Sequence, residues 1–142
     1  MAPVTIAGIP IGDGHPCRLA VDLGTNHQGD VRLALKMIEA AKAAGADFIK
    51  LQKRTPELSV PKAEWNELRD TPWGKMTKLD YRRRVEFSEE QYRELFAHAK
   101  KIGIVTFASV WDMFSLISME RLGSPCHKIP SARAHDTKLI RA

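Results

Sequence analysis

Cysteine and long apolar runs are the scarcest features of this 142-residue sequence. Its two cysteines, Cys17 and Cys126, are too few for a disulfide framework or a cysteine metal cluster, so we expect reduced thiols. No apolar run approaches the roughly 18 residues that a membrane-spanning helix needs. Residues 1–10 are apolar but contain two prolines and no basic lead, unlike an export signal. These absences predict a cytoplasmic protein with no membrane partner.

Sequence motifs for the common cofactors are also lacking. There is no Walker, zinc-finger or glycine-rich dinucleotide motif, and the five histidines show no paired metal spacing. We therefore predict that this chain contributes no metal ligands.

A positive charge is what the sequence does have. The net charge is +5, and residues 53–87 hold nine Lys and Arg against six Asp and Glu. Such a basic loop suits an acidic surface, a nucleic acid or a small anion. Because Arg82, Arg83 and Arg84 lie beside several glutamates, they are more typical of a solvated surface, and we expect no nucleic-acid partner. Nucleic-acid binding remains an alternative that rests on charge alone.

Short apolar runs alternate with helical patterns along the chain. We predict strands at residues 18–24, 47–52, 104–109 and 127–131, and a small hairpin at residues 4–11. Helices follow the N-caps Asp30, Asp112 and Asp136. The most secure helix starts at the capping box Ser88-Glu89-Glu90-Gln91 and ends at Gly103. The proline-rich segment after residue 52 is too long for a simple connection, so we expect it to carry function or a short helix of its own.

This alternation predicts an α/β fold with parallel strands and right-handed crossovers. Four βα units are half of a (β/α)8 barrel, which usually needs about 250 residues. We therefore expect residues 1–142 to form one partial TIM barrel, the N-terminal part of a barrel domain, with the hairpin at its bottom.

Polar residues at the ends of the predicted strands are the candidate site, because ligands bind at that end of parallel sheets. Lys50 and Gln52 are two apart and point to the same side of their strand. A lysine inside a barrel is costly unless it is paired or binds an anion, although Lys50 at a frayed strand end in water is equally compatible. Taken singly, Lys128 suits a solvated lysine, and Ser131 and Asp22 suit local caps. The full set is Asp22, Lys50, Gln52, Ser109, Lys128 and Ser131.

Several ordered motifs resemble the sialic acid synthase family, of the N-acetylneuraminate and legionaminate type. Residues 21–30, VDLGTNHQGD, resemble its AEIGxNHNGD opening, and residues 44–52, AGADFIKLQ, resemble its AGADAVKFQ strand. Residues 103–112, GIVTFASVWD, are similar to GIxFxSTPFD, and residues 128–131, KIPS, to KIxS. The spacing of 28 residues from Asp22 to Lys50 also matches.

The resemblance implies a transferase that condenses phosphoenolpyruvate with an N-acylmannosamine-type sugar, releasing phosphate and forming a nonulosonic acid. Lys50, Ser109, Lys128 and Ser131 would then bind phosphoenolpyruvate, and Gln52 the sugar. Asp22 would take the role of an active-site glutamate, making Asp22 and Lys50 the candidate catalytic residues. The complete enzyme is expected to use Mn²⁺ or Mg²⁺, held by histidines beyond this chain, and to form a homodimer.

Departures from the family pattern favour a second hypothesis. Asp22 is one methylene shorter than the usual glutamate, Ser109 replaces threonine, and Arg133 stands where an acid is usual. The resemblance implies that the second half barrel and the C-terminal antifreeze-like domain of the family would lie beyond residue 142. The alternative to the enzyme is a non-catalytic half barrel that binds anionic ligands or needs a partner chain.

Overall fold

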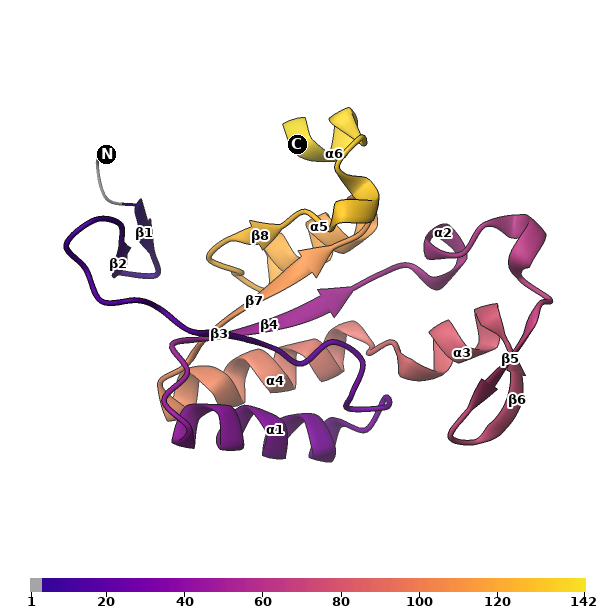
Figure 1. The fold of residues 1–142 in the computed structure, drawn as a ribbon, viewed down its shortest axis with the longest axis horizontal. Helices are drawn as coiled ribbons and strands as arrows, with labels where there is room; N and C mark the ends of the chain where they lie inside the picture. The colour runs from indigo at the N-terminus through magenta and orange to yellow at the C-terminus, as the bar shows by residue number, and fades with distance from the viewer. Residues whose placement is uncertain (1–3) are drawn as a thin grey trace.

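Four parallel strands form the central sheet, and helices cover one of its faces (Figure 1). The computed structural model describes residues 4–142. The strands lie in the order β3-β4-β7-β8, so the predicted parallel α/β architecture is confirmed. Their bounds are β3 Ala20–Asp22, β4 Phe48–Lys53, β7 Val105–Val110 and β8 His127–Lys128.

The helices begin at the predicted caps. Asp30 accepts hydrogen bonds from Arg32 and Leu33, and Ser88 forms the complete capping box with Gln91. Asp112 and Asp136 accept from the backbone of Ser115 and Leu139 in the same way. These caps start α1 Val31–Ala43, α4 Glu89–Ile102, α5 Met113–Arg121 and α6 Thr137–Arg141.

The hydrophobic core lies between the sheet and the helices. Ile49 and Leu51 of β4 are buried against Ile38 of α1 and Leu95 of α4, and all four are at most 1 % exposed. Alternation along β4 turns Phe48, Lys50 and Gln52 to the opposite face, which corresponds to the interior of a barrel. The predicted N-terminal hairpin is present as β1 Val4–Ile6 and β2 Ile9–Ile11, paired antiparallel.

The fourth strand is shorter than predicted. It ends at Lys128, whereas the prediction extended it to Ser131. Pro130 has no N–H to donate to a strand partner, and the chain turns after it into the 3-10 helix η2, Ser131–Arg133.

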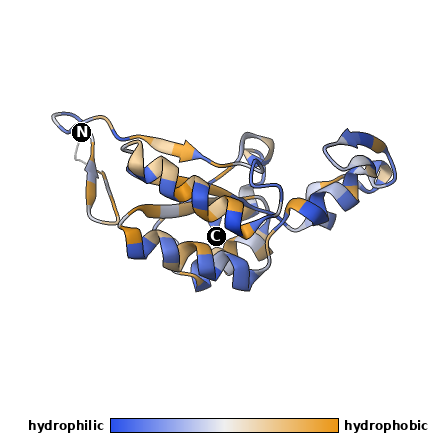
Figure 2. Cartoon of the chain, turned by 90° about the horizontal axis from the view of Figure 1, so that it is seen from below, coloured by the Kyte–Doolittle hydropathy of each residue, from blue (hydrophilic) through white to orange (hydrophobic). Residues whose placement is uncertain are grey.

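The segment after β4 folds into an arm, residues 56–85, that projects beyond the sheet (Figures 1 and 2). The predicted short helix is present, but the hairpin and the longer helix of the arm were not predicted. Of the three adjacent arginines for which a solvated surface was expected, Arg83 and Arg84 are exposed and Arg82 is half-buried. The elements of the arm are α2 Pro56–Ser59, η1 Lys62–Glu64, β5 Leu68–Thr71, β6 Gly74–Thr77 and α3 Lys78–Val85.

Every helix within residues 4–142 is too short or too polar to cross a bilayer.

Candidate functional site

The strand register brings five of the six predicted site residues to one face of the sheet. Asp22 is paired in register with Lys50, and Gln52 with Ser109, which is in turn paired with Lys128. Partners in a parallel ladder point to the same side, so all five side chains lie on the face opposite the helices. They occupy the C-terminal ends of four adjacent strands, the end at which parallel α/β folds bind ligands.

Lys50 and Asp22 form an ion pair at the centre of this face. Lys50 Nζ lies 2.5 Å from Asp22 Oδ2, and the two side chains are 16 % and 46 % exposed. Asp22 Oδ1 also accepts the N–H of Gly24 at 2.9 Å. Burial would raise the pKa of the Asp22 carboxyl, but the hydrogen bond and charge of Lys50 outweigh it and hold the pKa below its usual value. Asp22 is therefore both a cap for the turn after β3 and the counter-ion of Lys50.

The remaining strand-end residues differ in their exposure. Ser109 is 2 % exposed, whereas Lys128 lies exposed on the edge strand. Ser131 is also exposed and lies in η2, after the end of β8. The site thus combines a nearly buried cation, a buried hydroxyl and a solvated cation.

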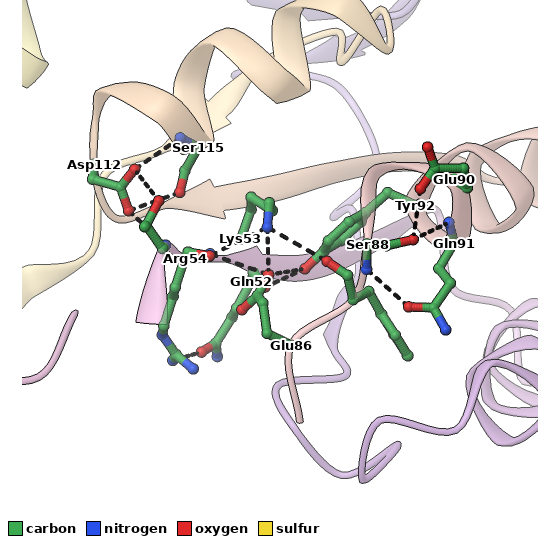
Figure 3. A network of polar contacts seen from close by, with 12 residues as sticks. Gln52, Lys53, Arg54, Glu86, Ser88, Glu90, Gln91, Tyr92, Asp112 and Ser115 are labelled. Atoms are coloured by element: carbon green, nitrogen blue, oxygen red, sulfur yellow. Dashed lines mark hydrogen bonds and ion pairs between the residues drawn. The ribbon is translucent and has the colours of Figure 1, made fainter. Parts of the chain in front are cut away.

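A buried polar network, which the sequence analysis missed, supports β4 from behind (Figure 3). Lys53 Nζ lies 2.8 Å from Glu86 Oε1, and the hydroxyl of Tyr92 donates to the Gln52 carbonyl at 2.6 Å. Burial raises the pKa of Glu86, although Lys53 acts in the opposite direction. These contacts join the end of β4 to the start of α4. Only Tyr92 and Phe87 gave a signal in the sequence, as a pair with helix-capping spacing; their rings contact edge to face at 5.7 Å.

His27 organises the turn between β3 and α1. Its ring stacks on Phe87 with centroids 4.1 Å apart, and its Nδ1 accepts the N–H of Gly29 at 3.1 Å. The side chain is 3 % exposed, and burial lowers its pKa to about 4. A neutral, buried imidazole in this position is a structural support for the turn.

Metal-ligating side chains are sparse on this face of the described residues. No group of three or more His, Cys, Asp or Glu side chains within residues 4–142 is arranged to hold a metal ion. Asp22 is the one carboxylate among the six candidate site residues, and it already forms an ion pair with Lys50 and accepts the N–H of Gly24. The described residues therefore do not fit a divalent metal by themselves.

Arg133, the residue that replaces an expected acid, has a structural partner. Its Nη2 donates to the carbonyl of Leu58 at 2.7 Å and so joins the segment after β8 to the arm. The arm and η2, which carries Ser131, therefore meet.

Comparison with known proteins identifies the relatives of this fold. The NeuB family profile matches residues 37–142. The chain is 37 % identical over 123 residues to N-acetylneuraminate-9-phosphate synthase of Mus musculus, covering 85 % of this chain and 34 % of that protein. It is 33 % identical over 117 residues to N,N'-diacetyllegionaminic acid synthase of Campylobacter jejuni, covering 80 % and 34 %.

A solved structure shares the fold. N-acetylneuraminic acid synthetase from Leptospira borgpetersenii, in complex with citrate, superposes with a TM-score of 0.84 at 26 % identity, covering 97 % of this chain and 44 % of that one. The chain spans about a third of the length of the curated relatives it matches. These matches confirm the predicted partial barrel and the family that the sequence motifs indicated. The chain belongs to the NeuB family.

Proposed function

We propose that this chain supplies the phosphoenolpyruvate-binding part of a nonulosonic acid synthase. The observation that carries the proposal is the row of Asp22, Lys50, Gln52, Ser109 and Lys128 on one face at the ends of four parallel strands. Family membership supports the reaction class, because the relatives are synthases of sialic, pseudaminic and legionaminic acids.

In the proposed reaction, C3 of phosphoenolpyruvate forms a bond to the aldehyde carbon of an N-acylmannosamine-type sugar. A water is consumed and inorganic phosphate is released. Lys50 and Lys128 attract the carboxylate and phosphate of phosphoenolpyruvate, and Ser109 and Ser131 donate hydrogen bonds to their oxygens. The low exposure of Lys50 strengthens its attraction for an anion, since screening by water is weak there.

Gln52 and Asp22 are assigned to the sugar side of the site. Gln52 has a neutral amide that can bind hydroxyl or carbonyl oxygens without adding charge. Asp22 stays ionised at neutral pH, since its pKa is lowered, and can accept a hydrogen bond from a sugar hydroxyl or a water. Because the described residues do not fit a metal, no step is assigned to one in this chain.

The alternative is a non-catalytic half barrel that only binds anions. It is favoured by Asp22 and Arg133, which depart from the family pattern at the site. The two functions share the anion site and differ in turnover, so one pair of experiments separates them.

Calorimetric titration of phosphoenolpyruvate into the chain tests the shared site. We expect Lys50→Met and Lys128→Met each to weaken binding by about tenfold, the effect of losing one charge-assisted hydrogen bond. Lys36→Met, which removes an exposed lysine from α1, is the matched control and should leave binding unchanged. Equal affinity in the wild type and Lys50→Met would rule out the proposed site.

Phosphate release tests the reaction. The chain is joined to the C-terminal remainder of the Leptospira synthetase and supplied with phosphoenolpyruvate, N-acetylmannosamine and Mn²⁺. Turnover that depends on Lys50 supports the synthase, whereas binding without turnover supports the anion-binding half barrel.

A further inference from the structure

Arg54, the residue directly after β4, is a buried cation beside the site. Its side chain is only 6 % exposed, and its guanidinium carbon lies 4.3 Å from the centre of the Trp111 ring. Its Nη2 donates a hydrogen bond to Oε1 of Gln52 (Figure 3). Its Nε has no hydrogen-bond partner among residues 4–142. A guanidinium is costly to bury, and the acceptor that the described part of the chain offers to it is the neutral amide of a site residue.

The backbone on both sides of Arg54 is held in place. The N–H of Arg54 donates to Glu86 Oε1 at 3.3 Å, and the N–H of Thr55 donates to Asp112 Oδ2 at 2.8 Å. The Gln52 carbonyl accepts the Tyr92 hydroxyl at 2.6 Å. Stacking on Trp111 restricts the guanidinium itself. Arg54 therefore presents its N–H groups to Gln52 from a fixed position.

This contact decides which way the Gln52 amide points. A glutamine amide has one acceptor end and one donor end, and arginine has only donors, so Arg54 can bind only the oxygen of Gln52. The amide nitrogen then faces the turn after β3, where a Cβ added to Gly24 would lie 3.6 Å from Gln52 Nε2. The Gln52 side chain also helps to lower the pKa of Asp22, which agrees with a donor end that faces the carboxylate.

We propose that Arg54 is a positioning residue that holds the Gln52 amide with its N–H₂ group directed into the site. Gln52 then acts as a hydrogen-bond donor and selects a ligand oxygen that can only accept, such as the acyl carbonyl of the sugar. Without Arg54 the amide is free to rotate and to present its oxygen, which repels the same ligand atoms. This role rests on the proposed function for the identity of the ligand, but the orientation of Gln52 does not.

Nitrogen-15 NMR of the chain tests the orientation directly. We expect the two side-chain N–H₂ protons of Gln52, assigned by their loss in Gln52→Leu, to be well separated and slow to exchange with water. In Arg54→Met they should converge toward free glutamine and exchange about tenfold faster, because the amide has lost its anchor. Arg84→Met is the matched control, because the Arg84 guanidinium also stacks on a tryptophan, 4.1 Å from the centre of the Trp73 ring, but Arg84 lies in the arm at the end of α3.

Two further measurements keep the test decisive. Arg54→Lys retains a donor and should restore part of the separation of the Gln52 protons. In the wild type, a nuclear Overhauser contact between the Arg54 guanidinium and the Gln52 side chain is expected without any substitution. Gln52 signals that are the same in folded Arg54→Met and the wild type, or absence of the wild-type contact, would overturn the proposal.

Ligand titration distinguishes positioning from general support. With N-acetylmannosamine and phosphoenolpyruvate as separate probes, Arg54→Met should weaken sugar binding by about tenfold and change phosphoenolpyruvate binding less than twofold. Equal weakening of both ligands would assign Arg54 a merely structural role and overturn the proposal. If the wild type binds neither probe, the proposed function fails, while the Gln52 signals still decide the role of Arg54.

Discussion

Asp22 limits the positive charge that Lys50 can offer to a ligand. The two groups lie 2.5 Å apart, so an anion arriving at Lys50 also meets the negative charge of Asp22. Asp22→Asn removes that charge while its side-chain oxygen can still accept the N–H of Gly24. We expect phosphoenolpyruvate to bind about fivefold more tightly, the effect of a partly exposed ion pair worth about 1 kcal/mol.

Calorimetry at low and high salt measures this change, and the gain should shrink as salt screens the charges. Glu39→Gln, in α1, removes an equal charge that is paired with His98 of α4 and not with a site residue, and serves as the control. Weaker binding by Asp22→Asn would mean that the carboxylate itself helps to hold the ligand.

His27 makes stability depend on pH. Its pKa is about 4 in the folded chain against 6.5 for a free histidine, so between these values the unfolded chain binds a proton that the folded chain does not. The contribution of neutral His27 to the free energy of unfolding is therefore fully present above pH 6.5. It falls by up to about 3 kcal/mol as the pH drops to about 4.

Urea unfolding across this pH range, compared between the wild type and His27→Asn, isolates the effect. Asparagine can still accept the N–H of Gly29 but does not titrate, so the variant should lose this part of the pH dependence. His15→Asn, in an exposed loop, should keep it. Parallel curves for the wild type and His27→Asn would contradict the assignment.

At the scale of elements, the turn before α1 and the end of α3 are in close contact at Gly29. A Cβ on Gly29 would lie 2.2 Å from the carbonyl oxygen of Arg84, and Gly29 has a φ of +77°. Gly45, with a φ of +87°, has nothing within 4 Å of the same position. Gly45→Ala should lower the free energy of unfolding by about 1 kcal/mol, because alanine is strained in a left-handed backbone conformation. Gly29→Ala should lower it by about 3 kcal/mol or more, because the backbone at Arg84 must also move.

Thermal and urea unfolding of both variants provide the comparison. Similar losses of stability would show that the arm yields readily at this contact, contrary to the expectation. A larger loss in Gly29→Ala would show that the arm and the turn after β3 form one rigid unit.

Local signals predicted most of the elements, and contacts between distant segments account for what was missed. Asp30, Ser88 and Asp112 are caps whose effect depends on residues two or three positions away, so the sequence reveals them. Helix α3 has few apolar residues, and the ring of Tyr81 lies 4.0 Å from the Arg69 guanidinium in β5. Stacking between a strand and a helix leaves no periodic pattern, which is why the arm was not predicted.

In the candidate site too, local signals predicted some features and contacts between distant segments account for the rest. Period-two alternation was sufficient to place Lys50 and Gln52 on one face, and the strand register confirms it. The sequence indicated only that Lys50 needs a partner or an anion, and its ion pair with Asp22 was not predicted. The contact of Arg54 with Gln52 depends on stacking against Trp111 from another strand end, and a single sequence carries no signal for it.

At the scale of the whole molecule, the sheet has two unpaired edges. Strand β8 is two residues long and carries Lys128, features that blunt an edge, whereas β3 has the neighbouring Leu19 56 % exposed. We therefore expect the isolated chain to associate with itself through β3. Light scattering after gel filtration at increasing concentration should show a rising mass.

Substitution can locate that association. Leu19→Lys should shift the equilibrium toward monomer, while Leu68→Lys, at a residue 66 % exposed in the arm, should not. A wild-type chain that stays monomeric at high concentration would contradict the expectation.

The three tryptophans lie in the arm and at the strand ends, where their fluorescence can be used as a signal. Trp65 donates to the Val60 carbonyl at 3.0 Å, Trp73 lies under Arg84, and Trp111 lies under Arg54. The hydrophobic core formed by the described residues contains no tryptophan. Intrinsic fluorescence of this chain therefore reports on the arm and the strand ends rather than on the core. With Trp65 and Trp73 replaced by phenylalanine, Trp111 is the remaining emitter. Its emission should change when a ligand binds at Gln52, because the Arg54 guanidinium contacts both side chains.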